Sequence, residues 1–184
     1  MDFDGAADII ISSEASVVAA LSGSPALTVF AAVRSDVADN SVYWFSAGST
    51  AVAGLSRSRG RGTNSTGTGC YLAGAVNDGG TGVSLNSTAS TGDTSAHAFE
   101  YFTDGSSGSI IIDGAAPDPK AALQAIGALT PTQCGVGGAA RQTPNAFWNG
   151  AVGEVIIYGR QLSPTDRFQV RQYLGAKWGI AVPP

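Results

Sequence analysis

The sequence predicts an all-β protein, built as a two-sheet antiparallel sandwich with a short C-terminal α-helix. Glycine supplies 25 of the 184 residues, about twice its usual share, while charged residues supply only 13%. Short apolar segments with period-two alternation recur along the chain, and turn sequences separate them. The strongest helix pattern stands at the C-terminus. We expect one domain over residues 1–184, because no linker or internal repeat divides the sequence.

The predicted strands follow from alternation and from the turns between them. Leu27 to Arg34 is the clearest, since every second side chain points to the same face. Asp-Gly and Asn-Gly pairs at 78–79, 104–105, 113–114 and 149–150 supply the turn chemistry. Stacking two sheets buries the apolar face of such strands. The predicted strands are 8–11, 27–34, 41–47, 50–56, 70–76, 82–85, 96–103, 109–112 and 151–158, with a glycine-rich strand near 135–140.

Two segments have helix signals. Ser163 is placed as an N-cap, Pro164 opens the first turn and Asp166 falls near the capping-box position. We expect the aromatic residues of this C-terminal helix to pack over an opening left by the sandwich; they are Phe168, Tyr173 and Trp178. A weaker signal, with an early proline and a terminating glycine, predicts a short helix from Asp118 to Gly127.

Charge and hydropathy exclude several partners. A net charge of −4 and a pI near 4.7 leave no basic field for a phosphate backbone, so no nucleic-acid partner is expected. No apolar run approaches the ~18 residues of a membrane-spanning helix, so no membrane partner is expected. Acidic residues stand at the N-terminus where a signal peptide needs basic ones. We therefore expect a chain kept in the cytoplasm until assembly or lysis, or else a mature fragment with an added Met.

The two cysteines leave two alternatives open. Cys70 and Cys134 are far apart in the sequence and match no metal-ligand spacing. They form a disulfide if the chain meets an oxidising compartment. Two reduced, partly buried thiols are favoured if it does not.

The sequence has no catalytic constellation, and we expect no enzyme. His97 is the only histidine, and no Gly-x-Ser-x-Gly elbow accompanies it. The glycines at 135–140 superficially match a dinucleotide fingerprint, but no βαβ unit encloses them. One histidine and two scattered cysteines cannot supply a zinc site. Glu154 lies among apolar strand residues and is interpreted as a hydrogen-bonded structural acid.

No cofactor is expected. Calcium is the one alternative that we keep, because Asp78, Asp93 and Asp104 all lie in turns and carry oxygen ligands. None of the three falls in a recognisable calcium loop. A structural role in the turns is therefore favoured for each.

Four segments carry a resemblance to a known family. They are FDGAADIII (3–11), LTVFAAVR (27–34), HAFEYFTDGSSGSIIIDG (97–114) and FWNGAVGEVIIYGRQLSPTDRFQVRQYLGAKWGI (147–180). With them the chain resembles a laminin G-like, concanavalin A-like jelly roll domain. Glycosidases of that fold have a Glu-x-Asp-x-x-Glu cluster on one strand, which this sequence lacks.

The resemblance implies recognition or assembly rather than catalysis. Similar domains occur on bacteriophage virions, so we expect a structural or adhesive virion protein, either a head decoration or a tail or fibre domain. Its expected partners are other virion proteins or a surface polysaccharide, and an oligomer is compatible with either. The alternative function is a carbohydrate-binding module or lectin, with an extracellular location. A eukaryotic extracellular adhesion domain is disfavoured, because the chain lacks the paired C-terminal cysteines expected there.

Two segments supply candidate contact residues. Arg57, Arg59 and Arg61 alternate in a glycine-rich stretch, and an extended backbone would place all three guanidinium groups on one side, ready for carboxylates. The alternative is a solvated edge strand or a mobile loop. The second segment offers a sugar or protein contact through Arg141, Asn145 and Trp148. Trp148 fits the hydrophobic core equally well.

Overall fold

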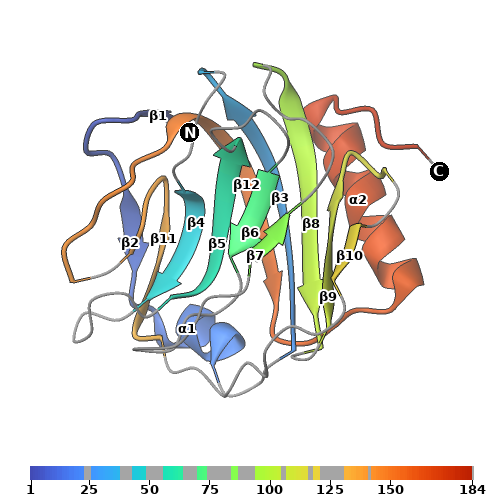
Figure 1. Cartoon of the computed structure of the whole chain (residues 1–184), viewed down its shortest axis with the longest axis horizontal. Coiled ribbons are helices and arrows are strands. Elements are labelled where there is room, and N and C mark those ends of the chain that lie inside the picture. The colour runs from blue at the N-terminus through green and yellow to red at the C-terminus, as the bar shows by residue number, and fades with distance from the viewer. Residues whose placement is uncertain are drawn as a thin grey trace.

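Two six-stranded sheets stack face to face, and a long helix lies on the outside of one of them (Figure 1). The computed structural model describes residues 1–22, 26–37, 43–48, 94–104, 107–115, 131–140 and 142–183, and describes the strands at 56–63, 70–73, 84–86 and 118–120 by their backbone. All strand pairs are antiparallel. The predicted sandwich with a C-terminal helix is confirmed.

The first sheet, called sheet A, carries the helix on its outer face. Its strand order is β1-β12-β3-β8-β9-β10. The bounds are β1 Asp2–Asp4, β12 Asn149–Tyr158, β3 Leu27–Ser35, β8 Ala96–Thr103, β9 Gly108–Ile112 and β10 Asp118–Lys120.

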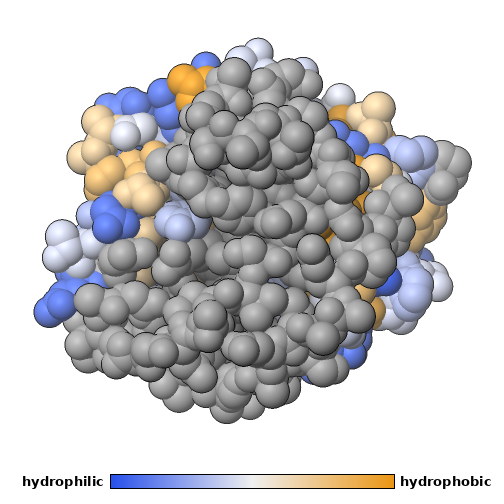
Figure 2. All heavy atoms as spheres, in the orientation of Figure 1, coloured by the Kyte–Doolittle hydropathy of each residue, from blue (hydrophilic) through white to orange (hydrophobic). Residues whose placement is uncertain are grey.

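The second sheet, called sheet B, has the order β2-β11-β4-β5-β6-β7. The bounds are β2 Ile10–Ser12, β11 Gln133–Val136, β4 Tyr43–Gly48, β5 Ser56–Thr63, β6 Cys70–Ala73 and β7 Ser84–Asn86. Ile10 and Ile11 on the outermost strand β2 are exposed, and Figure 2 shows hydrophobic surface on that side of the molecule.

Two segments form strands where the sequence predicted something else. The arginine-rich stretch forms strand β5, although alternation placed a strand at 50–56, most of which lies outside the described residues. Asp118–Lys120 forms strand β10 instead of starting a helix, because it pairs with β9 at the edge of sheet A, where Pro119 loses little by lacking an N–H. Residues 121–130 of that predicted helix lie outside the described part.

Helix α1, Ala15–Leu21, was not predicted from the sequence. Its N-cap residue Glu14 makes no side-chain capping hydrogen bond, so the usual start signal is missing. The helix is held by packing instead, since Leu21 is fully buried in the core. Figure 1 shows α1 at the lower end of the sandwich.

The main core lies between the two sheets. Alternate residues of β3 and β8 point inward and meet the apolar side chains of β4, β9 and β11. Trp44, Trp148 and Tyr101 are the largest fully buried side chains in it. Val155 and Ile157 of β12 pack against the same cluster.

Helix α2, Pro164–Trp178, begins and ends as the sequence predicts. The Ser163 hydroxyl accepts a hydrogen bond from the Asp166 amide at 3.2 Å, and Pro164 occupies the first turn. Gly179 ends the helix in the left-handed conformation, with φ of 68°.

The face by which α2 packs differs from the prediction. Leu174 and Gly175 are buried against the outer face of sheet A, where Leu174 joins a second apolar cluster with Phe30. Tyr173 and Trp178 are 46% and 40% exposed and fill no opening in the sandwich. Sheet A is therefore covered on both faces near α2, and two aromatic side chains remain at the surface.

A buried ion cluster joins α2 to sheet A. Glu100 of β8 is 0% exposed and forms a salt bridge and hydrogen bond with Arg171. Arg167 Nη1 lies 3.3 Å from the second carboxylate oxygen, and its guanidinium stands over the ring of Phe102. Burial raises the pKa of Glu100 and lowers the pKa of Arg167, because both charges have lost water. Each buried charge is therefore stabilised by the opposite charge beside it.

The substitution Glu100→Leu tests this dependence. It leaves two buried guanidinium groups without their carboxylate, and we expect the free energy of unfolding to fall by about 3–5 kcal/mol. Urea unfolding followed by circular dichroism measures the change. The combined variant with Arg167→Met and Arg171→Met should regain most of the loss, since no charge is then left unpaired. A single variant with wild-type stability would contradict this account.

Candidate binding surface

The arginine-rich strand β5 lies inside sheet B, between β4 and β6. The alternative that Arg57, Arg59 and Arg61 lie on an edge strand is therefore wrong. An interior strand is held on both sides by backbone hydrogen bonds, so its residues occupy defined positions in the sheet. A strand held in this way suits a binding surface better than an edge strand, which is paired on one side only.

The strand register gives the pairing partners of two of the arginines. Arg59 pairs with Ser46, and Arg61 pairs with Tyr43. Residues that pair across an antiparallel ladder share a face of the sheet. Arg57 falls in a register shift between Ser56 and Arg59, and a second shift separates the Arg61–Tyr43 pair from the Arg59–Ser46 pair.

Ser46 identifies the face that it shares with Arg59 as the outer one. Its neighbour Ala47 belongs to the core, while the Ser46 hydroxyl points away and donates to the Gly138 carbonyl at 2.8 Å. The same hydroxyl accepts from the Ala140 amide at 2.6 Å. On β11, a Cβ at Gly135, which pairs with Ser46, would stand 2.9 Å from the Ala140 side chain. The segment 137–140 thus lies on the outer face of sheet B, next to the position of Arg59.

Asn145 comes to the same face from further along the chain. Its carbonyl accepts from the Ala139 amide at 2.8 Å, and the Ala146 carbonyl accepts from the Tyr43 amide at 3.1 Å. The Asn145 residue itself is exposed. We call the group formed by Tyr43, Arg59, Arg61 and Asn145 the sheet-B surface. Arg141, the remaining arginine predicted here, lies outside the described residues.

Trp148 does not belong to this surface. It is 1% exposed, and its side chain lies in the main core between the sheets. Its amide donates to the Gly137 carbonyl at 2.9 Å, which ties the start of β12 to the loop. Of the two roles that the sequence left open, the structure assigns the core role, so Trp148 has no ring face free for a sugar.

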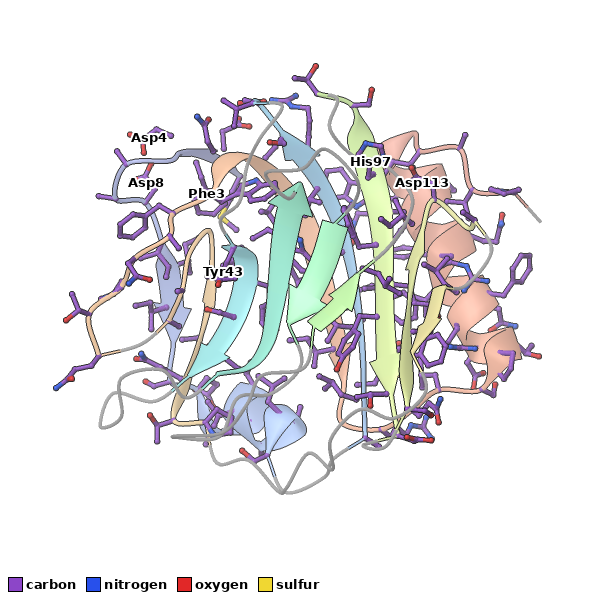
Figure 3. All side chains as sticks on the ribbon, in the orientation of Figure 1. Phe3, Asp4, Asp8, Tyr43, His97 and Asp113 are labelled. Atoms are coloured by element: carbon purple, nitrogen blue, oxygen red, sulfur yellow. The ribbon has the colours of Figure 1, made fainter. Side chains whose placement is uncertain are left out.

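His97 forms a close pair with Asp113. The distance from His97 Nδ1 to Asp113 Oδ2 is 2.6 Å, and Figure 3 shows the two side chains together at the ends of β8 and β9. The other carboxylate oxygen accepts from the Ala98 amide at 2.7 Å. Asp113 has a positive φ of 52° in the turn that follows β9. One carboxylate therefore fastens that turn to β8, which is a structural role.

Aspartates in turns behave as turn residues where the structure describes them. Asp104 accepts from the amide of Ser107 at 2.7 Å and from its hydroxyl at 2.9 Å. Asp78 and Asp93 lie outside the described residues. Within the described ranges, no three His, Cys, Asp or Glu side chains gather closely enough to hold a metal ion. Likewise, none of the described helices has the length and apolar character to cross a membrane.

Cys134 is a free thiol in the core. Burial raises its pKa, which keeps it protonated and unreactive. The reduced alternative is the one that the structure supports, because Cys134 makes no disulfide.

Glu154 is the hydrogen-bonded acid that the sequence predicts. It accepts from Tyr173 Oη at 3.2 Å, Lys177 Nζ at 2.9 Å and Trp178 Nε1 at 3.3 Å. The hydrogen bond from Lys177 is the main reason that the pKa of Glu154 is lowered. This carboxylate fixes the end of α2 on sheet A.

The segment of the sequence around Arg59 and Arg61 carries a net positive charge. Between Asp39 and Asp78 the sequence has no acidic residue, although the whole chain is acidic. That segment holds three of the ten basic residues. Arginine binds planar carboxylates through two parallel hydrogen bonds, so the chemistry of this segment suits an acidic ligand.

Solved structures with the same fold include sialidase domains. The CBM40 domain of Ruminococcus gnavus IT-sialidase, bound to α2,3-sialyllactose, matches with a TM-score of 0.73 and 15% identity over 93% of this chain and 94% of that one. The K499G mutant of the NanB sialidase from Streptococcus pneumoniae matches with a TM-score of 0.70 and 13% identity, and 91% of this chain covers 26% of that enzyme. A leech intramolecular trans-sialidase matches with a TM-score of 0.67 and 17% identity, over 92% of this chain and 27% of that one.

These similarities establish a shared β-sandwich fold. No protein-family model matches the sequence, and no curated protein is significantly similar to it. In the R. gnavus structure the match spans nearly all of a separate CBM40 domain, whereas it spans about a quarter of each sialidase. The chain therefore shares its fold with the R. gnavus CBM40 domain and with about a quarter of each sialidase.

The substitution Trp148→Ala tests the core assignment. Removing a fully buried indole leaves a large cavity, and we expect the free energy of unfolding to fall by about 3–5 kcal/mol. The measurement is chemical denaturation, with Asn145→Ala as the control at an exposed position of the same segment. The control should keep wild-type stability. A stable Trp148→Ala protein that loses only ligand binding would overturn the assignment.

Proposed function

We propose that the chain is a non-catalytic carbohydrate-binding domain that holds an acidic sugar on the sheet-B surface. The observation that carries the proposal is the pairing of Arg59 with Ser46 and of Arg61 with Tyr43 on an interior strand of sheet B. Sialic acid carries a carboxylate, and two arginines of one strand match it. Asn145 adds an amide group that can bond sugar hydroxyls.

The similar structures support the same class of ligand. The R. gnavus domain is bound to α2,3-sialyllactose in one structure and to α2,6-sialyllactose in another. Of the two functions considered from the sequence, these neighbours favour the carbohydrate-binding alternative over the virion role. Head decoration, a tail or fibre position and the location in a virion stay predictions, as does an extracellular location.

A titration with a simple acidic sugar tests the proposal. We expect the methyl glycoside of N-acetylneuraminic acid to bind, and its methyl ester to bind at least tenfold more weakly because it has lost the carboxylate. In the double variant Arg59→Ala/Arg61→Ala, affinity should fall about tenfold or more, since a hydrogen bond to a charged group contributes about 1.5–3 kcal/mol. Isothermal titration calorimetry gives the affinities.

Arg160→Ala is the matched control, because Arg160 is an exposed arginine at the end of β12, on sheet A. Its affinity for the glycoside should equal that of the wild type. Raising the salt concentration should weaken binding to the wild type, as expected for an exposed ionic contact. Failure of the glycoside to bind, or equal binding by the double variant, would refute the proposal.

A further inference from the structure

A hollow lies on the outer face of sheet A, beside the end of α2. It encloses about 270 Å³. Three neighbouring strands form its floor, and small residues line them: Ala151 and Gly153 on β12, Ala32 on β3 and Ala96 on β8. The helix ends at Trp178, and Ile180, which follows it, also lines the hollow and packs with Ala32. The hollow exists because small side chains coincide with the end of the helix.

The register shows how the floor is built. Ala151, Arg34 and Ala96 stand in one row across β12, β3 and β8. Ala32 stands two residues before Arg34 in β3 and lies on the same face of the sheet. The alanines give the hollow an apolar floor, and Arg34, Asp2 and the N-terminal residue Met1 add polar groups at its side.

Trp178 forms one wall, and it is the one exposed tryptophan of the three in the sequence. Its ring rests on Gly153, where a Cβ would stand 2.9 Å from the indole carbons. Its Nε1 donates to Glu154, which Lys177 also holds. The ring is thus fixed before any ligand arrives, which lowers the entropic cost of binding.

Arg34 forms the polar side of the hollow. Its Nε lies 3.0 Å from the Asp36 carboxylate, and its Nη2 lies 3.7 Å from the Asp2 carboxylate. Two carboxylates beside one guanidinium leave no excess positive charge for an acidic ligand. They do leave hydrogen-bond donors and acceptors side by side, which is what the hydroxyl groups of a neutral sugar need.

We propose that this hollow, which we call the Trp178 hollow, binds one neutral pyranose ring of a glycan. The ring places its C–H face on the indole and its hydroxyl groups toward Arg34 and Asp2. A small apolar cavity with one aromatic wall and a few fixed polar groups suits a ligand of this size and chemistry. The site is separate from the sheet-B surface, because the outer faces of two stacked sheets lie on opposite sides of the molecule.

Tryptophan fluorescence tests the proposal directly. Trp44 and Trp148 are each 1% exposed, so quenching by acrylamide reports on Trp178. We expect galactose, glucose or N-acetylglucosamine to reduce the quenching in a saturable way, with a dissociation constant on the order of millimolar for a single sugar ring. If none of the three changes the quenching up to about 50 mM, the proposal is wrong.

Two variants locate the response. Ala96→Leu fills the floor of the hollow at an exposed position, and it should weaken sugar binding at least tenfold while the unfolding midpoint stays the same. Ala176→Leu, at an exposed position of α2 that does not line the hollow, is the matched control and should bind as the wild type does. Arg34→Met, which removes the donors and keeps the aliphatic stem, should weaken binding severalfold.

Binding that persists unchanged in both Ala96→Leu and Arg34→Met would overturn the proposal. The double variant Arg59→Ala/Arg61→Ala separates this site from the sheet-B surface. It should keep its full response to neutral sugars even where it loses the acidic glycoside. Either proposal can therefore be refuted without affecting the other.

Discussion

The two-sided burial of sheet A is the constraint on which the rest of the structure depends. Its inner face packs on sheet B, and its outer face packs on α2. Burying the outer face places Glu100 where water cannot reach it, which in turn requires Arg167 and Arg171 on the helix. Because α2 packs on sheet A, the outer face of sheet B next to Ser46 is contacted by residues 138–140 instead.

Local signals predicted the parts of the fold that local chemistry determines. Ser163, Pro164 and Gly179 defined α2, and alternation located β3 and β8. Pairing partners decided the rest. Asp118–Lys120 became a strand because β9 offers an edge, and α1 forms without a side-chain cap because Leu21 is buried.

The candidate sites likewise combine features that the local sequence predicts with features that depend on how the strands and helices pack. The sequence singled out Arg59, Arg61 and Asn145, and the structure places the two arginines on strand β5 and bonds the Asn145 carbonyl to Ala139. The sequence could not show which tryptophan is exposed, because period-two and helical patterns do not say which face of an element meets solvent. Trp148 stands in the core, whereas Trp178 remains at the surface and forms the wall of a hollow. A run of small residues at 32, 96, 151 and 153 is the signal that could have located this hollow, but only after the strands were aligned.

An NMR titration of the labelled protein with the methyl glycoside of N-acetylneuraminic acid tests the central claim most directly. The amide signals of Tyr43, Ser46 and Asn145 report on the outer face of sheet B, and those of Ala96 and Ala151 report on the outer face of sheet A. If the sheet-B surface holds the acidic sugar, the first group shifts with saturation and the second group does not move. Shifts confined to the second group, or no shifts at all, would contradict the account.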